Sequence, residues 1–284
     1  MMLIADSGAT KTDWALIHAD GTAQYLTTQG LSPVHASESQ LSTVIAEELL
    51  PQLSATSPAT IHRIHFYGAG CSGHYADDMH ALLQRNFPGA SIEVNSDLLG
   101  AAHALCGEDS GLVCILGTGS NSCLYDGQRI VCRIPPLGYI LGDEGSGAVL
   151  GRMLLNRLLK DPSCVQLRDK LFQAYSLTYE DIIDRVYCQP QANRFLASLV
   201  PFVLENIGEP AILQLVLDNF RQFFRNNLCH YAATHQDIYA VGGVAHVFRS
   251  QLERVCEEFG MRLCRVLPRP IEGLVECGRW NVVV

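Results

Sequence analysis

The feature that most constrains the fold of this chain is a pattern that occurs twice. An apolar run at residues 2–5 leads into a turn rich in Gly, Ser and Thr, then into a second apolar run and an Asp-Gly turn. The same succession begins again at residues 112–116. Apolar runs separated by such turns predict β-hairpins. Two copies so far apart indicate an internal duplication of a whole domain rather than a short solenoid repeat.

The length and composition of the chain favour two domains. It has 284 residues, which is more than one hydrophobic core usually organises. Hydrophobic residues make up 48%, enough apolar surface to offset the entropy lost on folding, so disorder is excluded for most of the chain. We expect a first lobe at residues 1–107 and a second lobe at residues 108–270 with a helical insertion. A final helix at about 271–284 can pack back on the first lobe.

The charge and the cysteines exclude several classes of protein. The net charge is −9 and no basic block is present, which argues against nucleic acid as a partner but not against a small phosphorylated ligand. No apolar run has the length of a membrane span, and the first residues lack the basic region of a secretory signal. The 11 cysteines form no Cys-x-x-Cys pair, so we expect reduced thiols and a cytoplasmic protein. Four of them are expected to be small buried apolar residues: Cys106, Cys114, Cys123 and Cys132.

Strand and helix signals alternate in both halves, as in an α/β fold. Short apolar runs predict strands at residues 2–5, 14–18, 22–28, 61–67, 92–95, 112–116, 122–125, 129–134, 238–241 and 262–266. Helical spacing predicts helices at residues 38–53, 74–86, 97–105, 210–231, 245–259 and 271–280, with mostly helical signals over 146–235. Ser96 or Asp97 is expected to cap the helix that begins there.

The first turn, residues 6–12, has the composition of a phosphate-binding hairpin. Gly8 permits a tight turn with exposed backbone N–H groups, and the hydroxyls of Thr10 and Thr12 add donors. Asp6, at the end of the strand, is suited to hold Mg²⁺ through water. The segment is not a P-loop, and alone it is equally compatible with an ordinary turn. A second Gly-rich turn at residues 117–121 makes a clamp for the phosphates of one nucleotide the stronger interpretation.

Three further segments carry candidate functional residues where α/β folds bind ligands. Asp97 opens a helix after a strand and could accept the proton of a sugar hydroxyl, although a helix N-cap explains it as well and the two roles can coexist. Asp143 and Glu144 are candidates for binding substrate hydroxyls, or else only favourable charges at a helix N-terminus. Gly242 and Gly243 would let a flat ring approach the backbone, although tight packing of a strand against a helix gives the same pattern.

These five motifs, in this order, resemble those of the actin-like ATPase superfamily that includes hexokinases. The closest resemblance is to the family of N-acetylglucosamine kinases and benzoyl-CoA-reductase-activator-type ATPases. Its most specific pieces are residues 115–121, which contain GTGSN, and residues 142–146, GDEGS. The resemblance spans nearly the whole chain and implies a two-lobed, ribonuclease H-like α/β fold, with duplicated domains that each have a mixed sheet and flanking helices.

The resemblance implies an ATP-dependent kinase that phosphorylates an amino sugar: N-acetylglucosamine first, with glucosamine or N-acetylmuramate as alternatives. It implies Asp97 as the general base and Asp6 as the residue that organises Mg²⁺. The residues expected to bind ATP and its phosphates are Ser7, Gly8, Thr10, Lys11, Thr12, Gly117, Thr118, Gly119, Gly242 and Gly243. Those expected to bind the sugar are Ser120, Asn121, Gly138 and Asp143. Members of the family are often dimeric, which leaves a homodimer open.

Two departures from the family pattern concern the sugar. The loop at residues 30–36 lacks the asparagine and the aromatic residue that the family often carries, and Leu137 stands where the family has tryptophan. Two other functions stay open. One is an activator-type ATPase coupled to a partner enzyme, whose relatives carry an iron–sulfur cluster and a different second hairpin. The other is an inactive sugar sensor, against which the intact Asp6, Asp97 and Asp143 argue.

Overall fold

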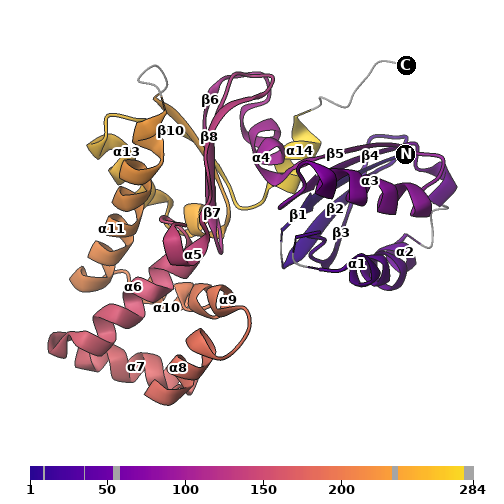
Figure 1. The fold of residues 1–284 in the computed structure, drawn as a ribbon. Coiled ribbons are helices and arrows are strands. Elements are labelled where there is room, and N and C mark those ends of the chain that lie inside the picture. The colour runs from indigo at the N-terminus through magenta and orange to yellow at the C-terminus, as the bar shows by residue number, and fades with distance from the viewer. Residues whose placement is uncertain (9, 35, 54–57, 232–235, 278–284) are drawn as a thin grey trace. The chain divides into compact units, whose positions relative to one another are not determined.

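The computed structural model describes residues 1–8, 10–34, 36–53, 58–231 and 236–277, and the chain forms two compact units. Unit 1 consists of Met1–Asp109 together with the segment that returns at Arg269, and unit 2 consists of Ser110–Pro268. Each unit is built on one five-stranded mixed sheet with helices packed against it (Figure 1).

The sheet of unit 1 is an antiparallel meander extended by two parallel strands, in the order β3-β2-β1-β4-β5. The strands are β1 (Met2–Ser7), β2 (Lys11–Ile17), β3 (Ala23–Gln29), β4 (Arg63–Gly68) and β5 (Ser91–Ser96). The helices are α1 (Glu38–Val44), α2 (Leu50–Gln52), α3 (His74–Asn86), α4 (Asp97–Cys106) and α14 (Pro270–Glu276). A π-helical turn at Ile45–Leu49 joins α1 to α2.

Alternation of side chains along the strands gives this sheet two different faces. Leu3 and Ala5 of β1, with Trp14 and Leu16 of β2, point into a core that also takes in apolar residues of α1 and α3. The opposite face carries Asp6. It is covered by α4 and α14, which pack on each other and on β1. The C-terminal segment thus contributes to the first unit.

The sheet of unit 2 repeats the arrangement of unit 1. A meander of β6 (Gly111–Leu116), β7 (Ser120–Tyr125) and β8 (Ile130–Ile134) is extended by the parallel strands β9 (Asp237–Val241) and β10 (Arg262–Leu267). The order β8-β7-β6-β9-β10 matches that of the first sheet strand for strand. This match confirms the predicted duplication and the two-sheet α/β fold class.

Most of the helices in unit 2 lie between β8 and β9. They are α5 (Gly138–Leu141), α6 (Gly147–Lys160), α7 (Val165–Tyr175), α8 (Tyr179–Tyr187), α9 (Ala192–Ala197), α10 (Val200–Glu205) and α11 (Pro210–Asn226). Two more, α12 (Gly243–Val247) and α13 (Arg249–Glu258), join β9 to β10. The core of this unit combines the apolar faces of β6, α6 and α11.

The helix predicted at residues 210–231 ends earlier, at Asn226. Tyr231 continues the apolar spacing but lies beyond the helix and is hydrogen-bonded to strands of the sheet. Its hydroxyl lies 2.8 Å from the Ser122 hydroxyl and accepts the Ile134 N–H at 2.9 Å. Because Tyr231 still faces the same core, the apolar period gave no sign that the helix had ended.

Two other predicted helices also differ in extent. The helix predicted at residues 245–259 is divided at Phe248, which has φ −109° and ψ 30° and so leaves helical geometry. Of the final helix predicted at 271–280, the structure describes Pro270–Glu276 as helical, and residues 278–280 lie outside the described residues.

All eleven cysteines lie within the described residues, and none of them forms a disulfide there. Cys106, Cys114 and Cys123 are buried, which confirms the prediction for these three. Cys132 is exposed, so the prediction is wrong there, because β8 is an edge strand with one uncovered side. None of the helices in the described part of the chain combines the length and the apolar character of a membrane span.

Candidate active site

The β1–β2 turn of unit 1 is closed by its backbone. The N–H of Gly8 donates to the carbonyl of Lys11 at 2.9 Å. Gly8 does not have a left-handed φ, and a Cβ added to it would lie 3.6 Å from that carbonyl oxygen, an ordinary contact. The turn itself therefore does not need a glycine. The contact of this turn with a bound phosphate therefore stays a prediction from the sequence. Residue 9 lies outside the described residues.

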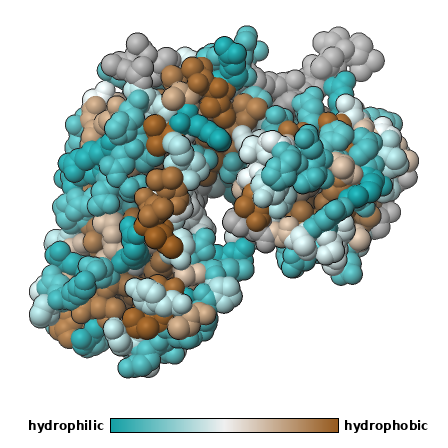
Figure 2. Space-filling view, in the orientation of Figure 1, coloured by the Kyte–Doolittle hydropathy of each residue, from teal (hydrophilic) through white to brown (hydrophobic). Residues whose placement is uncertain are grey.

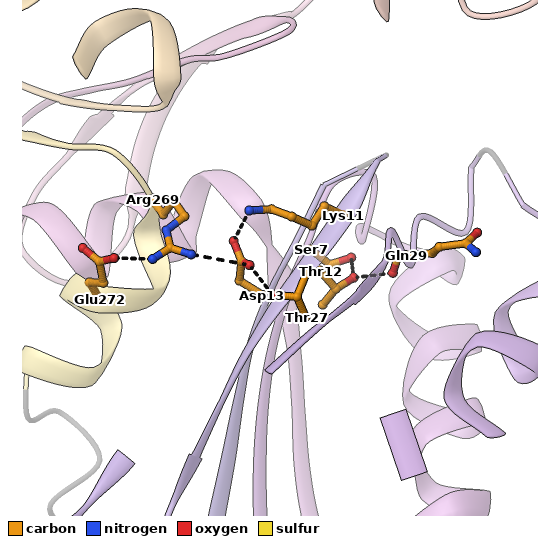
Figure 3. Close-up of polar contacts among 8 residues, drawn as sticks. All are labelled: Ser7, Lys11, Thr12, Asp13, Thr27, Gln29, Arg269 and Glu272. Carbon is orange, nitrogen blue, oxygen red and sulfur yellow. Dashed lines mark hydrogen bonds and ion pairs between the residues drawn. The ribbon is translucent and has the colours of Figure 1, made fainter. Parts of the chain in front are cut away.

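The hydroxyls of Ser7 and Thr12 form hydrogen bonds that stabilise this hairpin. Both residues are fully buried, and their oxygens are hydrogen-bonded to each other at 2.8 Å. Thr12 Oγ1 also donates to the carbonyl of Gln29 at 3.1 Å and so ties the hairpin to β3 (Figure 3). Of the predicted phosphate ligands in this segment, the side chains of Thr10 and Lys11 are exposed, whereas those of Ser7 and Thr12 are engaged within the sheet.

Three carboxylates gather on the face of unit 1 that α4 and α14 cover. Asp6 and Asp13 are paired directly across β1 and β2, and Asp97 is the first residue of α4. Burial raises the pKa of Asp6 to about 7, and the charges of Asp97 and Asp13 add to the rise while Lys11 opposes it. Asp6, the predicted metal ligand, and Asp97, the predicted base, therefore lie within electrostatic reach of each other.

The setting of Asp6 fits a role in holding Mg²⁺. Among the described residues, no three His, Cys, Asp or Glu side chains form a preformed metal cage. Mg²⁺ is commonly held instead by one or two carboxylates, waters and substrate phosphates. Burial, followed by repulsion from Asp97 and Asp13, raises the pKa of Asp6, and a bound cation would offset both effects, so the residues present are compatible with the ion.

Asp97 is not the N-cap of α4. That role belongs to Ser96, whose Oγ accepts the N–H of Leu99 at 3.3 Å. One oxygen of Asp97 accepts the N–H of Leu98 at 2.8 Å, and the residue is half-buried. Because its neighbour caps the helix, capping alone does not account for the carboxylate at position 97.

Close packing of α4 on β4 fixes the position of Asp97, and the residues responsible were not predicted. A Cβ at Gly100 would lie 2.7 Å from the ring of Tyr67, so only glycine lets the helix approach the strand this closely. The Tyr67 hydroxyl is hydrogen-bonded to His103 Nδ1 at 2.9 Å in the buried interior. The sequence signal was the glycine in the otherwise apolar first turns of a predicted helix.

In unit 2, the second Gly-rich turn is bonded to the start of α6. The N–H of Gly117 donates to the carbonyl of Gly119 at 3.0 Å. The carbonyls of Gly117 and Thr118 accept the N–H groups of Gly147 and Ala148 at 2.8 and 3.1 Å. The helix N-terminus thereby holds the turn in one conformation.

Asp143 is held against this turn in a strained backbone conformation. Its φ is +57°, which is uncommon for a residue with a side chain. Its carboxylate accepts the backbone N–H of Ser120, and burial nevertheless raises its pKa. A Cβ at Gly119 would lie 3.0 Å from the Asp143 carboxylate, which explains a glycine there. Strain of this kind is often found at functional sites.

A pocket of about 200 Å³ in unit 2 brings together three of the four predicted sugar ligands, Ser120, Asn121 and Asp143. Leu137, which replaces the tryptophan of the family pattern, also lines it. The fourth predicted ligand, Gly138, is not among the lining residues. It begins α5 with φ +73°, and its carbonyl accepts the N–H of Gly142 at 2.8 Å.

Asn219 of α11 supports this pocket and was not predicted. It is fully buried; its Oδ1 accepts the N–H of Gly145 at 2.9 Å, and its Nδ2 donates to the carbonyl of Ser146 at 3.1 Å. The loop that carries Asp143 is thus fixed from the core. A sequence signal was present, since an asparagine stands in the apolar stripe of a long helix, where it needs hydrogen-bond partners.

Gly242 has a packing role. Its φ is +118°, and a Cβ there would lie 2.4 Å from the carbonyl oxygen of Leu116. The alternative considered from the sequence, tight packing, therefore explains Gly242. A Cβ at Gly243 would meet nothing within 4 Å, so this position leaves open space beside the end of β9.

A larger groove, of about 750 Å³, lies among α5, α6, α8 and α9, and none of the predicted site residues lines it. Figure 2 shows apolar side chains gathered over the region of α5, where Ile140 and Leu141 are 70% and 74% exposed. Three of the predicted sugar ligands thus line the smaller pocket, and the larger groove is lined by none of the predicted site residues.

No family model matches the chain. A solved structure from Porphyromonas gingivalis, of a protein assigned as an N-acetylglucosamine kinase, is 41% identical over 100% of both chains, with a TM-score of 0.93. The glucosamine kinase GspK of Vibrio cholerae is 31% identical over 103 residues, so the match spans 36% of this chain and 35% of that curated relative.

A ROK family glucokinase from Streptomyces griseus, solved with glucose and AMPPNP, is 15% identical over 97% of both chains, with a TM-score of 0.58. At that identity the likeness shows a shared fold alone. The similarity to the Porphyromonas gingivalis protein, at 41% identity over the full length of both chains, establishes the family as well as the fold. This chain belongs to the N-acetylglucosamine kinase family of actin-like sugar kinases.

Proposed function

We propose that this protein is an ATP-dependent kinase that phosphorylates an amino sugar, with N-acetylglucosamine as the first candidate and glucosamine or N-acetylmuramate as alternatives. The observation that carries the proposal is the half-buried carboxylate of Asp97, held at the start of α4 beside Asp6. The relatives named as N-acetylglucosamine kinase and glucosamine kinase support the substrate class.

The two Gly-rich turns are the proposed phosphate-binding elements. In unit 1, the exposed side chains of Thr10 and Lys11 would face the nucleotide. In unit 2, a Cβ at Gly117 would meet nothing within 4 Å, so there is open space beside the backbone of this turn. Preorganised N–H donors and one cation stabilise phosphate charge without further rearrangement.

Asp6 is the proposed ligand of Mg²⁺. Bound there, the ion would supply neutralisation of the charge that develops on the transferred phosphoryl group. Asp97 would accept the proton of the attacking sugar hydroxyl. The proton leaves the hydroxyl as its oxygen bonds to phosphorus and the bond between the γ-phosphorus and the bridging oxygen of ADP breaks.

The pocket of unit 2 is the proposed sugar site. Asn121 and Asp143 offer an amide and a carboxylate that can hydrogen-bond sugar hydroxyls. Pro135, Leu137 and Leu141 form an apolar side of the same pocket, which suits the methyl group of an N-acetyl substituent. This apolar side is why we place N-acetylglucosamine before glucosamine.

The test is a coupled assay of ADP release with MgATP across N-acetylglucosamine, glucosamine, N-acetylmuramate, N-acetylmannosamine and glucose, with water alone as the control acceptor. The proposal predicts turnover with at least one amino sugar far above the water control. ATP hydrolysis that no sugar stimulates would contradict it and would favour an activator-type ATPase.

A further inference from the structure

Asp13 is a nearly buried carboxylate on which three donors from different elements converge. The residue is 4% exposed on β2. One of its oxygens lies 2.8 Å from the ammonium of Lys11. The other accepts the hydroxyl of Thr27 on β3 at 3.1 Å and lies 3.8 Å from the guanidinium of Arg269 (Figure 3).

A gain in stability does not explain this arrangement well. The carboxylate of Asp13 loses most of its hydration on burial, whereas Lys11 and Arg269 are 48% and 46% exposed, so solvent weakens their attraction to it. Asp13 also faces the like charge of Asp6 across the strand pair, which is an unfavourable cross-strand contact. Because stability does not account for the carboxylate of Asp13, we look for its role in the groups that it positions.

The first group that Asp13 holds is the ammonium of Lys11. Lys11 is the first residue of β2, directly after the turn that closes on Gly8, and its side chain is 48% exposed. A lysine in this position without a partner would sample many rotamers in solvent. The contact with Asp13 restricts the ammonium to the edge of the turn.

The second group is the guanidinium of Arg269. Arg269 precedes α14 as its N-cap residue and also pairs with Glu272 of that helix at 2.5 Å. Helix α14 packs on α4, whose first residue is Asp97. Through Arg269, Asp13 therefore also fixes the helix that supports the predicted base.

We propose that Asp13 is a positioning residue for the phosphoryl transfer: it holds Lys11 at the nucleotide turn and Arg269 at the head of α14. The inference rests on the proposed function, in which Lys11 faces the nucleotide phosphates. Asp13 acts through Lys11 on nucleotide affinity and does not itself touch the substrate.

The test compares kinetics and binding for the wild type, Asp13→Asn, Lys11→Met and the double variant. Asp13→Asn should raise the KM for MgATP about tenfold and leave the KM for the sugar unchanged, because one charge-assisted contact no longer orients the lysine. The double variant should be no worse than Lys11→Met alone. Binding of MgATP measured by calorimetry should weaken by the same factor.

Two further variants keep the test decisive. Asp237→Asn, which breaks the 2.8 Å ion pair with Arg262 in unit 2, is the matched control and should leave the KM for MgATP unchanged. Thr27→Val removes only the hydroxyl that orients Asp13 and should raise this KM about threefold. If Asp13→Asn does not fold, Thr27→Val decides.

Different results separate this inference from the proposed function. A wild type without sugar-dependent turnover would contradict the proposed function. The inference alone would be overturned if the wild type is active and neither Asp13→Asn nor Thr27→Val raises the KM for MgATP above that of the Asp237→Asn control. Losses that add in the double variant would also overturn it, because Asp13 would then act independently of Lys11.

Discussion

Asp6 and Asp13 stand directly opposite each other on the antiparallel strands β1 and β2, on the face that α4 and α14 cover. Burial is the main cause that raises the pKa of Asp6 from 3.8 to about 7, and repulsion from Asp97 and Asp13 adds to the rise. A cation bound beside Asp6 would offset both the burial of its charge and this repulsion.

The first prediction concerns stability and pH without Mg²⁺ or nucleotide. Asp6 binds a proton more strongly in the folded state, so its contribution to stability is present below pH 3.8 and is lost as the pH rises to about 7. Asp6→Asn cannot ionise, so the variant avoids this loss in the free energy of unfolding, which amounts to at most about 4 kcal/mol. In thermal denaturation, the Tm of Asp6→Asn minus the Tm of the wild type should therefore be larger at pH 8 than at pH 5. An equal Tm difference at both pH values would contradict the raised pKa of Asp6. So would the same pH dependence in the control Asp78→Asn, which changes an exposed acid.

The second prediction concerns the base. Asp97→Asn should lower kcat by about 10²–10⁴-fold, because the amide cannot take up the proton of the hydroxyl. The Tm should stay near that of the wild type, since Ser96 and not Asp97 caps α4. Asp77→Asn, which changes an exposed acid in the first turn of α3, is the matched control and should keep full kcat. Undiminished turnover in Asp97→Asn would remove the base assignment.

The third prediction separates two adjacent glycines. Gly242→Ala should destabilise the protein by about 2–4 kcal/mol, because the new Cβ would meet the Leu116 carbonyl at 2.4 Å and the φ of +118° is strained for alanine. Gly243→Ala should change the free energy of unfolding little, since nothing lies within 4 Å. Urea denaturation of both variants tests this. Equal stability of the two would contradict the packing role of Gly242.

The fourth prediction concerns the support of the sugar pocket. Asn219→Ala should cost about 2–3 kcal/mol of stability, because the N–H of Gly145 and the carbonyl of Ser146 lose their buried partner. The KM for the sugar should rise, since the loop with Asp143 is no longer fixed. Gln214→Ala, on the exposed side of the same helix, should change neither quantity. An unchanged KM in a destabilised Asn219→Ala would show that the loop does not depend on this residue for binding.

The fold was largely predictable because its strongest signals are local. Each Gly-rich or Asp-Gly turn between short apolar runs predicted a hairpin, and the repeat of this pattern predicted the two equivalent sheets. Ends of elements were harder to predict. Tyr231 kept the apolar spacing of α11 although it bonds to the sheet, so the spacing could not show where the helix ends.

The candidate site was predictable as a set of segments but not as a set of contacts. Side-chain direction decided which hydroxyls face the core: Ser7 and Thr12 are bonded to each other inside the sheet, and the sequence does not reveal that pairing. Partners distant in sequence were also hidden. Asn219 reaches the loop of Gly145, and Arg269 reaches Asp13, through tertiary packing that no local pattern encodes.

The central claim is transfer of a phosphoryl group to an amino sugar, and the most direct measurement follows the label from [γ-³²P]ATP with Mg²⁺ and N-acetylglucosamine, glucosamine or N-acetylmuramate. Phosphoryl transfer to the sugar should give a labelled sugar phosphate in amounts equal to the ADP formed. Label that appears only in inorganic phosphate, or stays in ATP with every amino sugar, would contradict it.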